Sequence, residues 1–139
     1  MERMRRRMIL AGAIALPAAA LSAAPPSALT QIAGGIWEVS GAPGLQQPIR
    51  QCFADVLTLA QFEHRGRTCS RTVLSDSGAS SVVNYSCGPA DFGRSEIDVI
   101  TPRSLRISTQ GISDKMPFNY VIQARRVGEC SQRQSASAH

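Results

Sequence analysis

The chain has 139 residues, of which 15 are Lys or Arg and 10 are Asp or Glu, and its formal net charge is +5. Four of the basic residues and one acidic residue lie among the first seven, so the rest of the chain carries a charge of about +2 when formal charges are counted. A nucleic-acid-binding protein is expected to keep a basic stripe with interleaved aromatic side chains. Here the remaining basic residues are scattered and aromatic residues make up 5% of the chain, which argues against nucleic acid as a partner.

The N-terminus has the composition of an export signal. A cluster of arginines within residues 3–7 precedes an apolar run, Met8–Ala20, which is shorter than the roughly 20 residues that a membrane-spanning helix needs. Small residues follow, so we expect signal peptidase to cut after Ala23, with the bond after Ala20 as the rival site. Residues 1–23 are therefore interpreted as a signal peptide.

Removal of the signal peptide leaves about 116 residues, an ordinary length for one domain. We expect residues 24–33 to form a short lead-in, residues 34–130 the folded domain, and residues 131–139 a flexible polar tail. A lipoprotein would need cysteine at the position of Ala24, so we expect no stable membrane anchor. The sequence therefore predicts a periplasmic or secreted protein.

The cysteines are the most informative residues of this domain. Their number is even, in a chain expected to leave the reducing cytosol: Cys52, Cys69, Cys87 and Cys130. Such a set predicts two disulfides. A metal site or a redox dithiol would favour closely spaced Cys-x-x-Cys pairs, which are absent, so no metal and no cofactor are expected.

The segment from Gln51 to Arg71 is predicted to contain one short helix. Apolar residues recur at nearly helical spacing after Asp55, a possible cap, and Gly66 provides a stop. A disulfide between Cys52 and Cys69 would join the two ends of this helical segment. The alternative is a bridge between Cys69 and Cys87, if the turn "SDSG" forms a tight hairpin.

The rest of the domain has the period-two pattern of β-strands. "GGIWEVS" reads as a strand with Trp37 and Val39 on a core-facing side. "TCSRTVL" with "SSVVNYSC", and "SEIDVIT" with "SLRIST", read as two hairpins, and "PFNYVIQARRV" as a last strand. The expected fold is mainly β, an antiparallel meander sheet or a partly closed barrel with one short helix and two disulfides.

The order of several short motifs resembles the DUF3617 family, a group of small exported bacterial proteins without an assigned biochemical function. These motifs, spread over Gly34 to Cys130, are "GGIWEVS", "GAPG", "QCF", "TCS", "YSCG" and "RRVGEC". The resemblance implies a periplasmic, mostly β domain with paired cysteines, and it supplies no catalytic residues. The helix opens with Phe53-Ala54-Asp55 instead of a Thr-Pro-Glu type of sequence, so its first residue stays open.

With this resemblance, we expect Cys130 to pair with Cys87 and Cys52 to pair with Cys69. The first bridge would tie the end of the last strand to the end of a middle strand.

Residues able to do chemistry are present but do not form a recognisable catalytic set. The acidic candidates are Glu38, Asp91, Glu96 and Asp98. Two of them alternate with apolar residues on one strand, as solvent-facing residues do. His64 is a possible general base, but a solvent-exposed place at a helix end is the favoured interpretation. No Gly-x-Ser-x-Gly nucleophile motif occurs, so we expect no catalytic residues and no enzyme activity.

Two functions remain. We favour a non-catalytic module of the cell envelope that binds a protein partner through a sheet edge or through the loop "GPADFG". The alternative is a carrier whose inward-facing side chains enclose a small apolar ligand. Those side chains would be Val83, Tyr85, Ile97, Val99, Ile107, Phe118 and Tyr120.

Overall fold

The computed structural model of the chain describes residues 27–131 and residue 133. The predicted signal peptide, its cleavage site, the first part of the lead-in and most of the polar tail lie outside these residues, and so they stay predictions. Within the described residues, no helix is long and apolar enough to cross a membrane.

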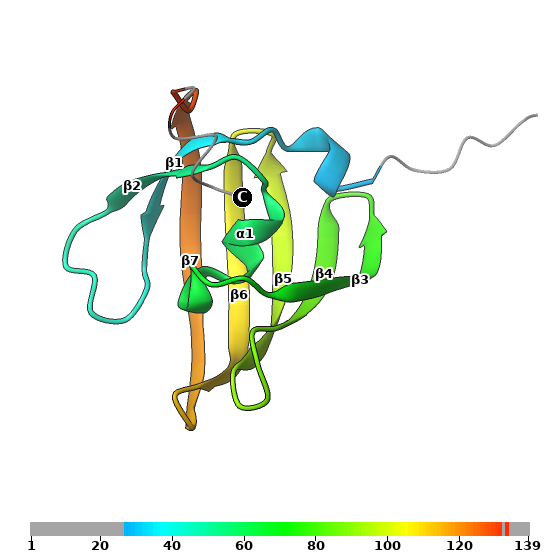
Figure 1. The fold of residues 1–139 in the computed structure, drawn as a ribbon. Coiled ribbons are helices and arrows are strands. Elements are labelled where there is room, and N and C mark those ends of the chain that lie inside the picture. Colours follow the sequence, from blue (N-terminus) through cyan, green and yellow to red (C-terminus); the bar gives the residue numbers. More distant parts are fainter. Residues whose placement is uncertain (1–26, 132, 134–139) are drawn as a thin grey trace, which may run out of the picture.

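Seven strands form one antiparallel sheet with the order β2-β1-β7-β6-β5-β4-β3 (Figure 1). Their bounds are β1 Gly35–Ser40, β2 Ile49–Phe53, β3 Ser70–Ser77, β4 Ser80–Ser86, β5 Phe92–Thr101, β6 Ser104–Ser113 and β7 Met116–Gly128. Strands β3 to β7 follow one another as a meander, and the β1–β2 pair is added beside β7. The sheet is open, so the mainly β prediction is confirmed in its meander form.

Alternating side chains give the sheet two different faces. In β5, Ile97 and Val99 are buried, whereas Glu96 is exposed. In β1, Trp37 and Val39 are fully buried, as predicted. We call the face that holds these buried side chains the inner face and the opposite one the open face. Both predicted hairpins are present, as β3–β4 and β5–β6.

A short helical segment covers the inner face (Figure 1). It consists of α1, Leu57–Ala60, and the 3-10 turn η2, Phe62–His64. Asp55, the expected cap, lies one residue before the N-cap position, which Val56 occupies, and its Oδ1 accepts the Leu57 N–H at 2.9 Å. The helix is shorter than the sequence indicated, since the backbone departs from helical geometry at Gln61.

The core lies between this segment and the sheet. Leu59 and Phe62 pack among fully buried side chains of the strands, which include Trp37, Ile97, Leu105, Ile107 and Ile122. Each such side chain contributes about 1.5–3 kcal/mol through burial. A buried polar bridge fixes the helix to the sheet, because the Ser95 hydroxyl contacts the Ala60 carbonyl oxygen and the Thr109 hydroxyl.

Both disulfides are present, but their predicted pairing is wrong. The bonds join Cys52 to Cys130 and Cys69 to Cys87, with Cα–Cα distances of 5.5 and 4.1 Å. The alternative hairpin bridge, Cys69 to Cys87, is therefore the correct one, and neither Cys52–Cys69 nor Cys87–Cys130 forms. Two disulfides indicate an oxidising, extracytoplasmic environment.

Strand register explains this pairing. Ser70 lies opposite Ser86 in the β3–β4 ladder, so Cys69 and Cys87 extend the same ladder by one step. Cys52 belongs to β2, where Ile36 of β1 separates it from Gly128 of β7. Cys130, two residues further on, reaches across the end of β1 to Cys52. The predicted pairing differs because Cys52 was expected in front of a helix, whereas it lies in strand β2.

Candidate functional site

The open face carries a row of polar side chains that crosses five strands. Residues paired in antiparallel strands lie on the same face, so the pairings of β3 with β4, β4 with β5, β5 with β6 and β6 with β7 define the row. Its members, which we call the polar row, are Thr72, Asn84, Arg94, Gln110 and Asn119. All five side chains are exposed. At the usual strand spacing, the row is about 19 Å long.

A second row on the same face lies beside the polar row and is less polar. It contains Ser70, Ser86, Phe92, Ile112 and Pro117, again paired across the five strands. Phe92 is 47% exposed, so much of its ring is open to solvent. The polar row, the second row except Pro117, and the loop at Gly88 and Pro89 line an open groove of about 950 Å³.

Two glycines face each other beneath this groove. Gly93 of β5 pairs with Gly111 of β6. A Cβ atom on Gly93 would lie 2.5 Å from the Tyr85 hydroxyl oxygen, and one on Gly111 would lie 2.1 Å from the Phe92 carbonyl oxygen. Only glycine fits these two positions. Glycine inside a strand is typical of a bend or a close approach of backbones, which matches the hollow above the pair.

The polar row differs from the rest of the open face in its hydrogen bonding. Among the described residues, none of its five side chains has a hydrogen-bond or ion-pair partner. Elsewhere on this face, Arg106 lies 3.6 Å from the Asp98 carboxylate, and Arg125 donates to Glu38 at 3.0 Å. The groove therefore concentrates polar groups that are free to bind a ligand.

His64, the candidate general base, lies in a buried cluster. Only 3% of it is exposed, so the predicted solvent-exposed place at a helix end is wrong. Its Nδ1 lies 3.3 Å from the Tyr85 hydroxyl and its Nε2 lies 3.7 Å from Asp91 Oδ1. The ring also meets Tyr85 and Phe118 edge-on. The reason is the η2 turn, which directs His64 toward the sheet.

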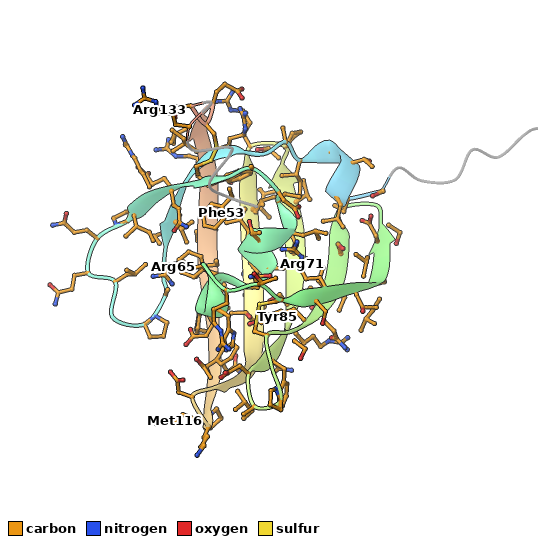
Figure 2. All side chains as sticks on the ribbon, in the orientation of Figure 1. Phe53, Arg65, Arg71, Tyr85, Met116 and Arg133 are labelled. Carbon is orange, nitrogen blue, oxygen red and sulfur yellow. A yellow bond between two sulfur atoms is a disulfide. The ribbon has the colours of Figure 1, made fainter. Side chains whose placement is uncertain are left out.

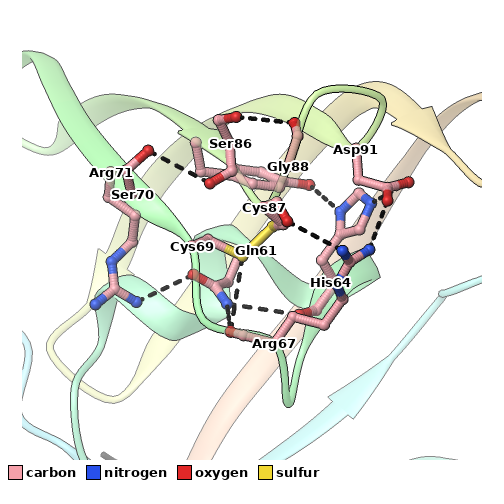
Figure 3. The surroundings of a disulfide bond; sticks show 11 residues. Gln61, His64, Arg67, Cys69, Ser70, Arg71, Ser86, Cys87, Gly88 and Asp91 are labelled. Atoms are coloured by element: carbon pink, nitrogen blue, oxygen red, sulfur yellow. Dashed lines mark hydrogen bonds and ion pairs between the residues drawn. A yellow bond between two sulfur atoms is a disulfide. The ribbon is translucent and has the colours of Figure 1, made fainter.

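Asp91 lies beside His64 and Arg67 (Figure 3). Its carboxylate accepts a 2.6 Å hydrogen bond from Arg67 and a 2.9 Å bond from the Asp114 N–H. Arg67 also donates to the Cys87 carbonyl oxygen at 3.0 Å. The Arg67 hydrogen bond is the main reason why the pKa of Asp91 lies below its usual value. The cluster thus holds the loop after Cys87 against the β6–β7 turn.

Tyrosines complete the inner side of this region. Burial raises the pKa of Tyr85 to about 12, so its hydroxyl is protonated at neutral pH. The Tyr120 hydroxyl donates to Glu63 at 2.8 Å, and burial raises the Tyr120 pKa as well. A general base must reach its substrate, whereas His64 is enclosed by aromatic rings. These contacts support a structural role for His64.

Three of the four acidic candidates lie on strands of the sheet, and each of the four has a basic or hydroxyl partner within the protein. Glu38 accepts hydrogen bonds from Arg50 and Arg125, which lower its pKa. Asp98 pairs with Arg106, and Glu96 accepts from the Ser80 hydroxyl at 3.5 Å. Among the described residues, no group of three or more His, Cys, Asp or Glu side chains is placed to hold a metal ion.

A second groove, of about 810 Å³, lies between β2, α1 and the start of β3. Figure 2 shows Phe53, Arg65 and Arg71 around α1 in this region. Its arginines are engaged within the protein: Arg71 with Asp55 at 3.0 Å, Arg67 with Asp91, and Arg65 over the Phe62 ring at 4.4 Å. Because these cations already have partners, the open-face groove is the stronger candidate.

No family model, no curated protein and no solved structure matches the chain. The resemblance to DUF3617 therefore stays a prediction.

Val83, Tyr85, Ile97 and Ile107 lie on the inner face, as predicted from their strands, whereas the polar row was not predicted. The alternation in each strand puts Asn84, Arg94, Gln110 and Asn119 on the solvent side. What brings them together is the register between strands, which a single strand pattern does not contain. The loop "GPADFG" was predicted as a contact site, and four of its six residues, Gly88, Pro89, Phe92 and Gly93, line the groove.

Proposed function

We propose that this chain is an exported, non-catalytic binding module of the cell envelope, and that the open-face groove is its binding surface. The observation that carries this proposal is the polar row, whose side chains have no partner among the described residues. A concave site with a few convergent polar groups beside an apolar surface is typical of ligand recognition. Phe92 supplies that apolar surface.

Export is supported by the disulfides, which persist in oxidising compartments. The N-terminal arginine-rich and apolar segment agrees with this location.

A second candidate is a protein partner that adds a strand to the free edge of β3. Val73 and Leu74 are 41% and 48% exposed there, which favours such a contact. However, the register shifts between Val73 and Ser75, and bulges of this kind protect edges from pairing. The groove is therefore preferred to the edge.

A carrier of a small apolar ligand has less support. The inward side chains expected to enclose the ligand include Val83, Ile97 and Ile107, which are 0% exposed because Leu59 and Phe62 cover them. Filled packing of this kind leaves no volume for a guest.

Site-specific photo-crosslinking in intact cells tests the proposal. A diazirine amino acid replaces Gln110 in the groove, and in a matched control it replaces Gln123, which is exposed on the same face outside the groove. We expect a discrete added mass on irradiation from position 110 and none from position 123. No adduct from position 110, or equal adducts from both positions, would contradict the proposal.

A further inference from the structure

We propose that the open-face groove binds an acidic oligosaccharide, a chain of sugar rings that carries carboxylate groups. This inference rests on the proposed function, because it names the class of ligand for the same groove.

The hydrogen-bonding groups of the polar row match those of a sugar. Each side-chain amide of Asn84, Gln110 and Asn119 offers both donors and an acceptor, and the Thr72 hydroxyl offers both as well. Sugar hydroxyls also donate and accept, so each can pair with a group of this kind. Because the row runs across the strands for about 19 Å, it suits an elongated ligand.

Phe92 provides a flat surface beside this row. Its ring is 47% exposed, and its register neighbours Ser86 and Ile112 leave it open. The face of an aromatic ring carries partial negative charge. It therefore attracts the polarised C–H groups on the apolar face of a sugar ring, while the hydroxyls at the rim of the sugar reach the polar row.

Arg94 indicates that the ligand is acidic. It is the charged side chain among the residues that line the groove, and within the described part of the chain it has no carboxylate partner. Arg106 and Arg125, on the same face, each have one. A guanidinium binds a carboxylate through two parallel hydrogen bonds, so a ligand carboxylate would complete this site.

Other partner classes fit these side chains less well. A nucleic acid would need several cations to neutralise its phosphates, and the groove has one. A protein interface centres on large buried anchors, whereas the polar row, which runs the length of the groove, supplies hydrogen-bonding groups and no such anchor. A lipid would leave the polar row without partners.

Calorimetric titration of the folded, oxidised mature chain tests the inference. The probes are oligomers of galacturonic acid, oligomers of mannuronic acid, and glycan strands whose sugars carry a lactyl carboxylate; their carboxyl-reduced forms are the neutral controls. We expect at least one acidic probe to bind at least tenfold more tightly than its neutral form. Preference for the first two or for the third distinguishes a uronic-acid polymer from a cell-wall glycan as the source.

Variants locate the binding. We expect R94Q to remove the preference for the acidic probe and F92A to weaken binding of both forms at least tenfold. R106Q is the matched control, because Arg106 lies on the same face but pairs with Asp98, and it should leave affinity unchanged. Binding that R94Q does not alter would overturn the inference, and so would the absence of binding by all acidic probes.

The crosslinking experiment separates this failure from failure of the proposed function. If position 110 yields an adduct in cells while no acidic probe binds, the groove is a binding surface for another class of ligand and only the carbohydrate assignment is wrong. If neither occurs, both are wrong.

Discussion

The Asp91 carboxylate joins three separate segments of the chain. It receives hydrogen bonds from Arg67 and from the Asp114 N–H, and His64 Nε2 lies 3.7 Å away. None of these residues belongs to the groove, but together they hold the loop that forms one rim of it.

We predict that D91N lowers stability at neutral pH and reduces the loss of stability in acid. The pKa of Asp91 is lowered in the folded state, so its ionised form contributes stability above its unfolded pKa of about 3.9. That contribution disappears as the pH falls through the lowered folded pKa. Urea unfolding of wild type and D91N between pH 7 and pH 2 measures the difference.

The control is E96Q, the same kind of change at an exposed carboxylate of β5, five residues further along the chain. It should change stability by no more than about 0.5 kcal/mol. Parallel stability curves for wild type and D91N over the whole pH range would show that Asp91 has no such role.

A substitution at Gly111 tests whether the glycine pair is needed for the close packing beneath the open-face groove. We predict that G111A destabilises the fold by about 1–3 kcal/mol, because the new Cβ would lie 2.1 Å from the Phe92 carbonyl oxygen. G128A is the matched control, since a Cβ there meets no atom within 4 Å. Thermal unfolding measures the loss of stability of G111A and of G128A relative to wild type. Equal losses in the two variants would refute the steric explanation.

At the scale of elements, the two disulfides close loops of very different length. Their sequence separations are 78 for Cys52–Cys130 and 18 for Cys69–Cys87. The chain-entropy relation predicts contributions of about 4.5 and about 3 kcal/mol. The long bridge also fixes the edge strand β2 to the end of β7.

We therefore predict that the C52S/C130S double variant loses more stability than C69S/C87S. Chemical denaturation under non-reducing conditions measures both against wild type. A larger loss of stability from C69S/C87S would contradict this prediction. It would mean that the Cys69–Cys87 disulfide, which lies beside Arg67 and Asp91, contributes more stability than the Cys52–Cys130 disulfide.

Most elements could be predicted because their information is local. Strands such as β5 and β7 have a clear alternation of apolar and polar residues, and Trp37 and Val39 stand in phase on β1. The segment at Cys52 has no such pattern, since β2 is short and only Phe53 in it is buried. Its assignment depends on pairing with β1, and the disulfide connectivity depends on that assignment.

At the scale of the whole molecule, the site is a product of register. Each residue of the polar row looks like an ordinary solvent-facing side chain in its own strand, and the same is true of Phe92. Only the complete meander brings five such residues into one line over the glycine pair. His64 is a similar case, because its burial follows from packing against Tyr85 and Phe118 and not from its own sequence context.

NMR tests most directly whether the groove is the binding surface. Backbone amide chemical shifts of the isotope-labelled mature chain are recorded while a soluble envelope extract from the source cells is added. We predict that the shifts concentrate at Thr72, Asn84, Arg94, Gln110 and Asn119 and at their neighbours in the groove. Shifts confined to Val73 and Leu74 on the β3 edge would favour strand addition by a protein. Shifts confined to core residues around Leu59 would favour an enclosed apolar ligand. Either of these two results would contradict the groove as the binding surface.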